Sequence, residues 1–219
     1  MEKLTNLDEY IGRCNKEQKA IYYITGDDIN ILRNSPQLEA FKQKGIEVLL
    51  MNEPIDEFWP QVLPSYKNFA IKHISQADID MTWKRDEKKA DDGSLKQLTE
   101  FMAEFLKEDV AKVVTTEKLT ASPVSITVEN GQMSLHLERL MRNHQQQTAF
   151  ASTRILELNP YHPLIIRLAD MVMVDTNAEK VKEISRILLD QAKVAEGEPI
   201  SDPSFYSERI SGYILKSLD

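Results

Sequence analysis

Two short apolar runs separated by about twenty residues constrain the fold of this chain more than any other feature. The runs cover residues 21–25 and 46–51, with Gly26 directly after the first and Gly45 directly before the second. The connection is too long for a hairpin and has a helical pattern, so the runs are predicted to be parallel strands of a βαβ unit. The first run hardly alternates between polar and apolar residues, which is typical of a strand covered on both faces.

The neighbouring segments extend this unit into a small layered domain. Ser35 is expected to cap a helix whose first residue is Pro36 and which Gly45 ends. Residues 69–74 alternate and are predicted to form a third strand. The fold class expected for the first part of the chain is therefore α/β, a small three-layer αβα subdomain.

The second half has a different pattern, and we expect an α+β fold there. Strands are predicted at residues 110–115, 124–128 and 154–158, which gives a three-stranded sheet with two amphipathic helices, 178–195 and 203–218, at the end of the chain. A run of charged residues between the halves indicates a boundary. The predicted division is a first domain over 1–82, a charged linker over 83–93 and a second domain over 94–219.

Composition excludes several classes of protein. The chain has 219 residues, of which 42% are hydrophobic and 28% charged, and its net charge is −8. An acidic chain without a basic cluster argues against nucleic-acid binding. We find no apolar run long enough to span a membrane and no secretory signal, and the single cysteine, Cys14, fits a reducing compartment. These features predict a soluble, cytoplasmic protein.

No residue pattern indicates an active site. The turn after the first strand carries one glycine followed by Asp27 and Asp28, which would repel an anion, so a structural turn is favoured over a phosphate site. His136 and His144 are eight residues apart but lack a third ligand at metal-binding spacing. We therefore predict no catalytic, cofactor-binding or metal-binding residue in this chain.

Two features could form binding surfaces. A stripe of methionine and leucine recurs at helical spacing through Met133, Leu137, Leu140 and Met141. By pattern alone, this stripe is more typical of core packing than of a partner surface. The two terminal helices could pair with a second copy of the chain or could pack within one chain, and the pattern favours neither.

Motifs along nearly the whole chain resemble the family of ninety-kilodalton heat-shock protein chaperones. In the first half these are IYYITG, NSP, KGIEVLLM and EPIDEF, and in the second half VAKVVTTEKLTASP, ELNPYHPLI and LLDQAKVAEGEPISDPSFYSERI. The chain ends in ILKSLD and lacks the MEEVD tail of the eukaryotic cytosolic members, so the resemblance is to the bacterial branch. The order of the motifs corresponds to the end of the family's middle domain followed by its C-terminal dimerisation domain.

The resemblance implies an ATP-driven, homodimeric chaperone whose nucleotide domain lies upstream of the part that this chain matches. It therefore implies no ATPase activity and no cofactor for this fragment, with ATP and Mg belonging to the full-length protein. The expected partners are a second copy of the chain and unfolded or partly folded client proteins, with no nucleic acid and no membrane. Two alternatives remain open: a small α/β ligand-binding or regulatory enzyme fused to a dimerisation module, and a scaffold protein without client activity.

The resemblance also assigns roles to the two candidate surfaces. It places client binding on Met133, Leu137, Leu140 and Met141, which changes the interpretation of that stripe from core to surface. The family's dimer interface corresponds to the terminal helices. The expected interface residues there are Ile184, Ile187, Leu188, Ile210, Ile214 and Leu218.

Overall fold

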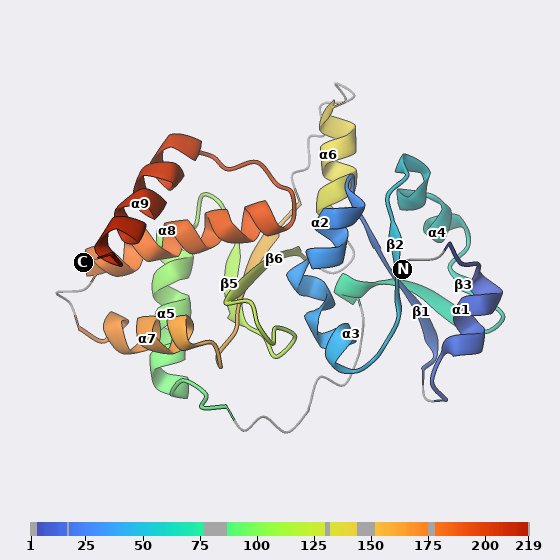
Figure 1. The fold of residues 1–219 in the computed structure, drawn as a ribbon, viewed down its shortest axis with the longest axis horizontal. Coiled ribbons are helices and arrows are strands. Elements are labelled where there is room, and N and C mark those ends of the chain that lie inside the picture. Colours follow the sequence, from blue (N-terminus) through green and yellow to red (C-terminus); the bar gives the residue numbers. More distant parts are fainter. Residues whose placement is uncertain are drawn as a thin grey trace. The chain divides into compact units, whose positions relative to one another are not determined.

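The structure, a computed structural model, describes residues 4–16, 18–76, 87–129, 132–143, 152–174 and 178–218. The chain divides into two compact units (Figure 1). Unit 1 comprises Met1–Trp83 and Val128–Thr153, and unit 2 comprises Lys84–Thr127 and Arg154–Asp219. The sequence pattern predicts that residues 128–153 lie in the second domain, but they belong to unit 1.

Unit 1 is built on a four-stranded sheet with the order β2-β1-β4-β3. The central strand β1 (Ala20–Thr25) runs parallel to β2 (Val48–Met51) and to β4 (Phe69–His73), and the two-residue β3 (Ser65–Tyr66) is antiparallel to β4. The parallel pair that the sequence predicted is therefore present. The predicted third strand lies on the other side of β1 from β2.

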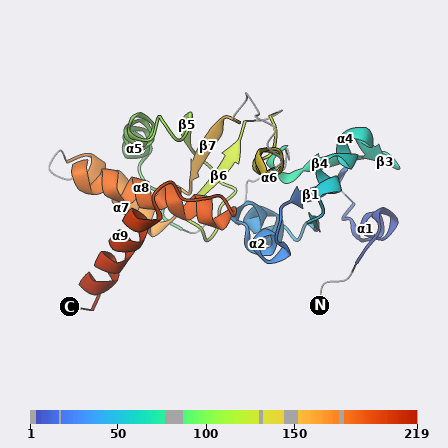
Figure 2. The ribbon, with the colours of Figure 1, turned by 90° about the horizontal axis from the view of Figure 1, so that it is seen from above.

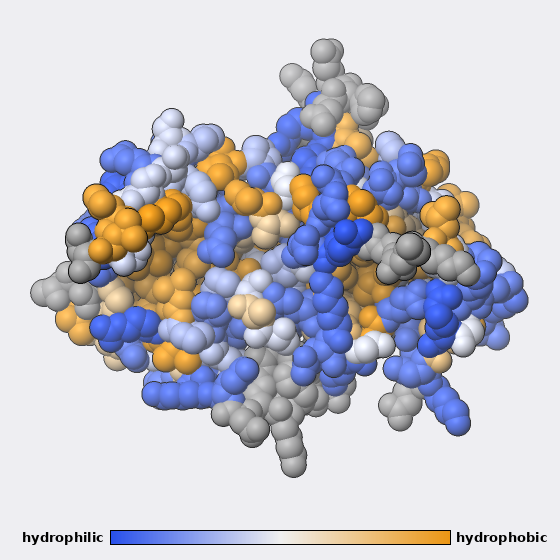
Figure 3. All heavy atoms as spheres, in the orientation of Figure 1, coloured by the Kyte–Doolittle hydropathy of each residue, from blue (hydrophilic) through white to orange (hydrophobic). Residues whose placement is uncertain are grey.

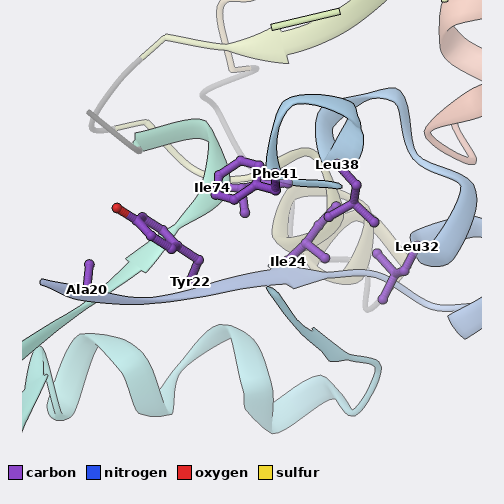
Figure 4. Close-up of a cluster of buried hydrophobic side chains, with 7 residues drawn as sticks. All are labelled: Ala20, Tyr22, Ile24, Leu32, Leu38, Phe41 and Ile74. Carbon is purple, nitrogen blue, oxygen red and sulfur yellow. The ribbon is translucent and has the colours of Figure 1, made fainter. Parts of the chain in front are cut away.

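Helices cover both faces of this sheet, as the lack of alternation in β1 indicated. On one face, Ala20, Tyr22 and Ile24 of β1 pack under the helices that lead to β2, in a cluster shown in Figure 4. On the other face, Ile21 packs with Tyr10. The covering helices of the first face are α2 (Ile29–Asn34), the 3₁₀ turn η1 (Pro36–Leu38) and α3 (Glu39–Gln43), and those of the second are α1 (Leu7–Arg13) and α4 (Trp59–Val62).

The connection between β1 and β2 contains one more helix than predicted, because Pro36 divides it. The residue before a proline is disfavoured in the helical region, and Ser35 has an extended backbone at the end of α2. The Ser35 hydroxyl then accepts a hydrogen bond from the Gln37 amide, which caps the next turn as expected. Gly45 ends α3 with a φ of 63°, a conformation that favours glycine.

The segment from β2 to β4 positions a buried carboxylate. It contains the 3₁₀ turn η2 (Pro54–Glu57), whose last residue, Glu57, is buried although it is charged. The Asp56 side chain accepts from the Glu53 amide and from the Trp59 indole, and these bonds hold the turn in place. A further 3₁₀ turn, η3 (Ile74–Gln76), follows β4.

Unit 2 contains a three-stranded sheet with the order β5-β7-β6. Its strands are β5 (Lys112–Thr115), β6 (Val124–Val128) and β7 (Arg154–Leu158), close to the predicted ranges, and β5 is parallel to β7. The helices are α5 (Asp92–Phe105), α7 (Pro163–Val172), α8 (Ala178–Ala195) and α9 (Pro203–Lys216). Helix α5 begins at Asp92 with Asp91 as its cap, inside the predicted linker, whose residues 83–86 lie outside the described part of the chain.

The core of unit 2 lies between the sheet and helices α5, α7 and α8. Leu98 of α5, Leu156 of β7 and Leu168 of α7 are fully buried, and α8 contributes Leu188 and Leu189. Helix α9, in contrast, has no buried residue and extends away from α8 (Figure 2). The last helix therefore adds little to the core of its own unit.

Candidate functional site

The candidate site is built around α6 (Leu135–Asn143), the short helix of unit 1 that carries most of the predicted client-binding stripe. The Ser134 hydroxyl accepts a hydrogen bond from the Leu137 amide at 3.0 Å and so caps the helix. The same hydroxyl donates to Glu57 Oε1 at 2.9 Å. The start of α6 is thereby fixed to η2, which is almost eighty residues earlier in the chain.

The imidazole of His136 lies between two carboxylates. Its Nδ1 is 2.8 Å from Glu57 Oε1 and its Nε2 is 3.0 Å from Asp27 Oδ1. The His136 and Glu57 side chains are 4% and 7% exposed, whereas Asp27 is 57% exposed. Both ring nitrogens can donate only when the imidazole is protonated, so this geometry fits an imidazolium held by one buried and one accessible carboxylate.

Electrostatics favour the charged forms of this pair. Burial lowers the pKa of His136, but the hydrogen bond and charge of Glu57, followed by those of Asp27, outweigh it, and the pKa is raised above its usual 6.5. Burial raises the pKa of Glu57, but hydrogen bonds from His136 and Ser134 outweigh that effect, so it lies below its usual 4.5. Both shifts therefore favour the imidazolium–carboxylate pair over its neutral form.

Two further contacts hold α6 along its length. Arg139 donates through Nε to Asp27 Oδ2 at 3.2 Å, so Asp27 bonds two side chains of the helix. Glu138 is buried and accepts from Arg142 at 2.6 Å and from the Ser152 amide at 3.0 Å. The polar side of α6 thus contacts the rest of unit 1, at Asp27 and Ser152, through charged groups.

A cavity of about 480 Å³ lies beside this network, within unit 1. It is partly open to solvent and has both apolar and polar walls. Its lining includes Tyr23, Glu57, Pro60, Gln61, Ile71, His73, Glu129, Met133, Ser134 and Leu137. Glu57 therefore borders the cavity and also contacts His136, and Met133, Ser134 and Leu137 contribute to the lining.

Two titratable groups in the cavity wall are uncharged at neutral pH. Burial lowers the pKa of His73 to about 4, and its Nδ1 accepts from the Ser75 amide, so the ring proton lies on Nε2. Burial and the charge of Glu57 raise the pKa of Tyr23 to about 12. Glu57 is therefore the charged residue of the cavity wall that contacts His136.

The predicted client-binding residues differ in their exposure. Met133, Leu140 and Met141 are partly exposed, while Leu137 is buried at 8%. Leu137 lies in the cavity wall rather than on an open surface. The four residues therefore share a helix region, but one of them is covered in this structure.

The predicted interface residues divide in a similar way. Ile187 and Leu188 of α8 are buried within unit 2, and Ile184 is partly buried. On α9, Ile210 is partly buried, and the exposed apolar side chains are Ile214 at 56%, Leu215 at 64% and Leu218, just beyond the helix, at 78%. Apolar side chains gather at this end of α9 in the space-filling view (Figure 3).

Sequence reasoning missed the residues that hold α6. His136 was considered only as a metal ligand, and Asp27 only as part of a turn. Nothing in the local pattern of EPIDEF distinguishes the buried Glu57 from the surface carboxylates near it. A buried imidazole between carboxylates becomes visible only when segments about 80 and 110 residues apart are brought together.

The part of the chain that the structure describes has neither a metal-binding cluster nor a membrane-spanning helix. No group of three or more histidine, cysteine or acidic side chains there could hold a metal ion, and His144 lies outside that part. None of the helices described is both long and apolar enough to cross a bilayer.

Comparison with known proteins identifies the family. All of residues 1–219 match the family model described as Hsp90 protein. The chain is 36% identical over 233 residues to the chaperone protein HtpG of Orientia tsutsugamushi (strain Boryong), covering 100% of this chain and 37% of that protein. It is 40% identical over 223 residues to the chaperone protein HtpG of Paramagnetospirillum magneticum, covering 98% of this chain and 36% of that protein. The chain thus spans little more than a third of the length of these curated relatives, and it belongs to the Hsp90 family.

Proposed function

We propose that this chain acts as part of a molecular chaperone, supplying homodimerisation and part of the surface that binds unfolded client proteins. The family match and the relatives named chaperone protein HtpG support a chaperone role. Because the chain spans only about a third of those relatives, the ATP dependence of the whole protein belongs to the proposal too. A cytoplasmic location, as the sequence predicts, is also part of it.

We assign the chain to the end of the family's middle domain and the C-terminal dimerisation domain. The order of the family motifs and the two-unit organisation support this assignment. The turn after β1 argues against a nucleotide site, because it has one glycine followed by two aspartates, and Asp27 is engaged with α6. Calorimetric titration with Mg-ATP tests the assignment. We expect no heat of binding, and tight binding would instead assign the chain to the ATPase region or to a nucleotide-dependent enzyme.

The observation that carries the dimer proposal is the exposed apolar end of α9. Ile214, Leu215 and Leu218 are each more than half exposed, and α9 buries no residue in its own unit. An amphipathic terminal helix without a partner is stabilised by pairing with its copy, which gives a closed two-fold assembly. Sedimentation equilibrium should give about twice the mass of one 25.2 kDa chain. A single-chain mass at micromolar concentration would overturn the dimer.

The client-binding proposal depends on the partly exposed residues of the α6 region. Met133, Leu140 and Met141 offer flexible apolar side chains, which adapt to partners of varied shape. Suppression of the thermal aggregation of an unrelated enzyme tests this role. The double variant Leu140→Ser/Met141→Ser should suppress aggregation less than the parent chain does. Val194→Ser, which alters a half-exposed apolar residue of α8, is the matched control and should behave as the parent. Equal suppression by all three proteins would exclude the α6 surface.

A further inference from the structure

The contacts of His136 have a consequence beyond client binding itself. We propose that His136, Glu57 and Asp27 form an ionic latch that holds α6 against the rest of unit 1 and keeps Leu137 covered, and that deprotonation of His136 releases the helix. The latch is an intramolecular contact between the first turn of α6, the turn η2 and the loop after β1. Its role in restricting client access rests on the proposed function, whereas the latch itself does not.

The geometry makes the latch dependent on a single proton. The protonated ring donates to Glu57 at one nitrogen and to Asp27 at the other. A neutral ring has one N–H, so one carboxylate then faces a lone pair and the corresponding hydrogen bond is lost. Glu57 is the more consequential partner, because it is buried and loses a charged donor that water cannot easily replace.

The release of α6 would change the surface that unit 1 presents. Leu137 and Ser134 come from the α6 segment and form part of the cavity wall with Met133. When the helix separates, the buried Leu137 joins the partly exposed Leu140 and Met141 on a free apolar side. The closed form therefore presents a smaller apolar surface than the open form.

The direction of the pH dependence follows from the charged groups around His136. These are Glu57 from η2, Asp27 from the loop after β1, Arg139 from α6 itself and His73 from the end of β4. The pKa of His136 is raised when the latch is closed. Protonated His136 therefore stabilises the closed latch fully below about pH 6.5, and this stabilisation is lost as the pH rises through the raised pKa. His73 titrates near 4 and does not contribute in this range.

Hydrogen exchange of the 219-residue chain between pH 6 and 9 tests the latch, after correction for the intrinsic pH dependence of exchange. Peptides from 135–143 report on α6, and peptides from β1 serve as an internal reference for the folded sheet. Protection of α6 should fall about tenfold or more across this range, the factor that corresponds to loss of a hydrogen bond to a charged group. Protection of β1 should stay constant.

Four variants separate the latch from a general loss of structure. Glu57→Gln should move the midpoint of release to lower pH, and His136→Gln should abolish the pH dependence. Asp27→Asn should lower the protection of α6 by less than about fivefold, because Asp27 is exposed to solvent and its ion pairs are weak. His162→Gln, which removes a histidine that caps α7 in unit 2, is the matched control and should leave the α6 midpoint unchanged.

Constant protection of α6 from pH 6 to 9 in the parent chain would refute the latch, as would a Glu57→Gln variant with the parent midpoint. The parent series needs no variant, so it decides the question even if a substitution prevents folding. Because exchange is measured without a client, failure of the latch leaves the aggregation assay unaffected. A latch that opens without any gain in client binding would contradict only its role in restricting access.

Discussion

Replacement of Ile214 by aspartate gives the sharpest test of the dimer proposal. Ile214 is 56% exposed on the apolar end of α9. Full burial of an isoleucine side chain contributes about 1.5–3 kcal/mol, so burial of the exposed half contributes about 1 kcal/mol per chain. In a two-fold interface each substitution acts twice, so loss of the apolar side chain alone costs about 2 kcal/mol per dimer.

The aspartate adds an unpaired charge to each half of the same interface. Burying a polar group without a partner costs about 1–3 kcal/mol in proteins, and a charge costs more. Together the two effects weaken dimerisation by about 4 kcal/mol or more, which corresponds to roughly a thousandfold rise in the dissociation constant. The fold of the single chain should be retained, because Ile214 is not part of its core.

Sedimentation equilibrium over a range of concentrations measures this change, with far-UV circular dichroism as the test of folding. Lys216→Asp is the matched control, since it also introduces a negative charge but lies about 200° around the helix from Ile214. The control should dimerise nearly as well as the parent. The proposed interface is wrong if Ile214→Asp has the dissociation constant of the parent, or if both variants weaken the dimer equally.

Three further predictions concern the two units separately. Tyr10→Phe should lower the free energy of unfolding of unit 1, measured in urea, by about 1–3 kcal/mol. The buried hydroxyl donates to the Glu47 carbonyl and accepts from Gln18 Nε2 and the Tyr22 amide, and all three bonds are lost. A change within about 0.5 kcal/mol would contradict this account. Asp109→Asn should destabilise unit 2 by about 1–3 kcal/mol at pH 7, because Asp109 bonds Arg186 and Lys193. Burial raises the pKa of Asp109, but the two cations outweigh this effect and hold the pKa below 3.8. The difference in unfolding free energy between parent and variant should therefore vanish only when the pH falls below 3.8 in acid unfolding. Gly45→Ala should cost about 1 kcal/mol from its positive φ alone, since no atom lies within 4 Å of the added methyl group, and thermal unfolding would show a larger loss if a clash were present.

The regular elements were largely predictable from local patterns. The strand in 21–25 was visible because β1 is covered on both faces, and helix 178–195 was visible because one side of it is apolar. Ser35, Pro36 and Gly45 have the roles that their backbone preferences predict. The two-residue strand β3 was not predicted, because Ser65 and Tyr66 are too short a segment to show an apolar pattern. They pair with Ala70 and Phe69 of β4 across a tight turn.

The candidate site was much less predictable, because it depends on contacts between distant segments. The Met/Leu stripe could be found from its spacing, but its partial burial could not, since the buried Leu137 borders a cavity whose other lining residues include distant ones from Glu57 to His73. A buried Glu57 has no local signature, because its burial is set by how η2 packs. The dimer and client roles came from resemblance to a family and not from any pattern of residues.

The discontinuous composition of unit 1 affects the order in which the chain can fold during synthesis. Its sheet is complete once β4 has emerged, but the segment 128–153 that also belongs to this unit is made only after β5 and β6 of unit 2. Domains usually fold as units in the order of synthesis, and exposed apolar surface in a waiting segment promotes aggregation. Until α6 leaves the ribosome, the Glu57 carboxylate has no His136 to pair with, and the cavity lacks the part of its lining that comes from Met133, Ser134 and Leu137. A nascent chain therefore passes through a stage in which the sheet of unit 1 is complete, while Glu57 and part of the cavity lining still lack their later partners.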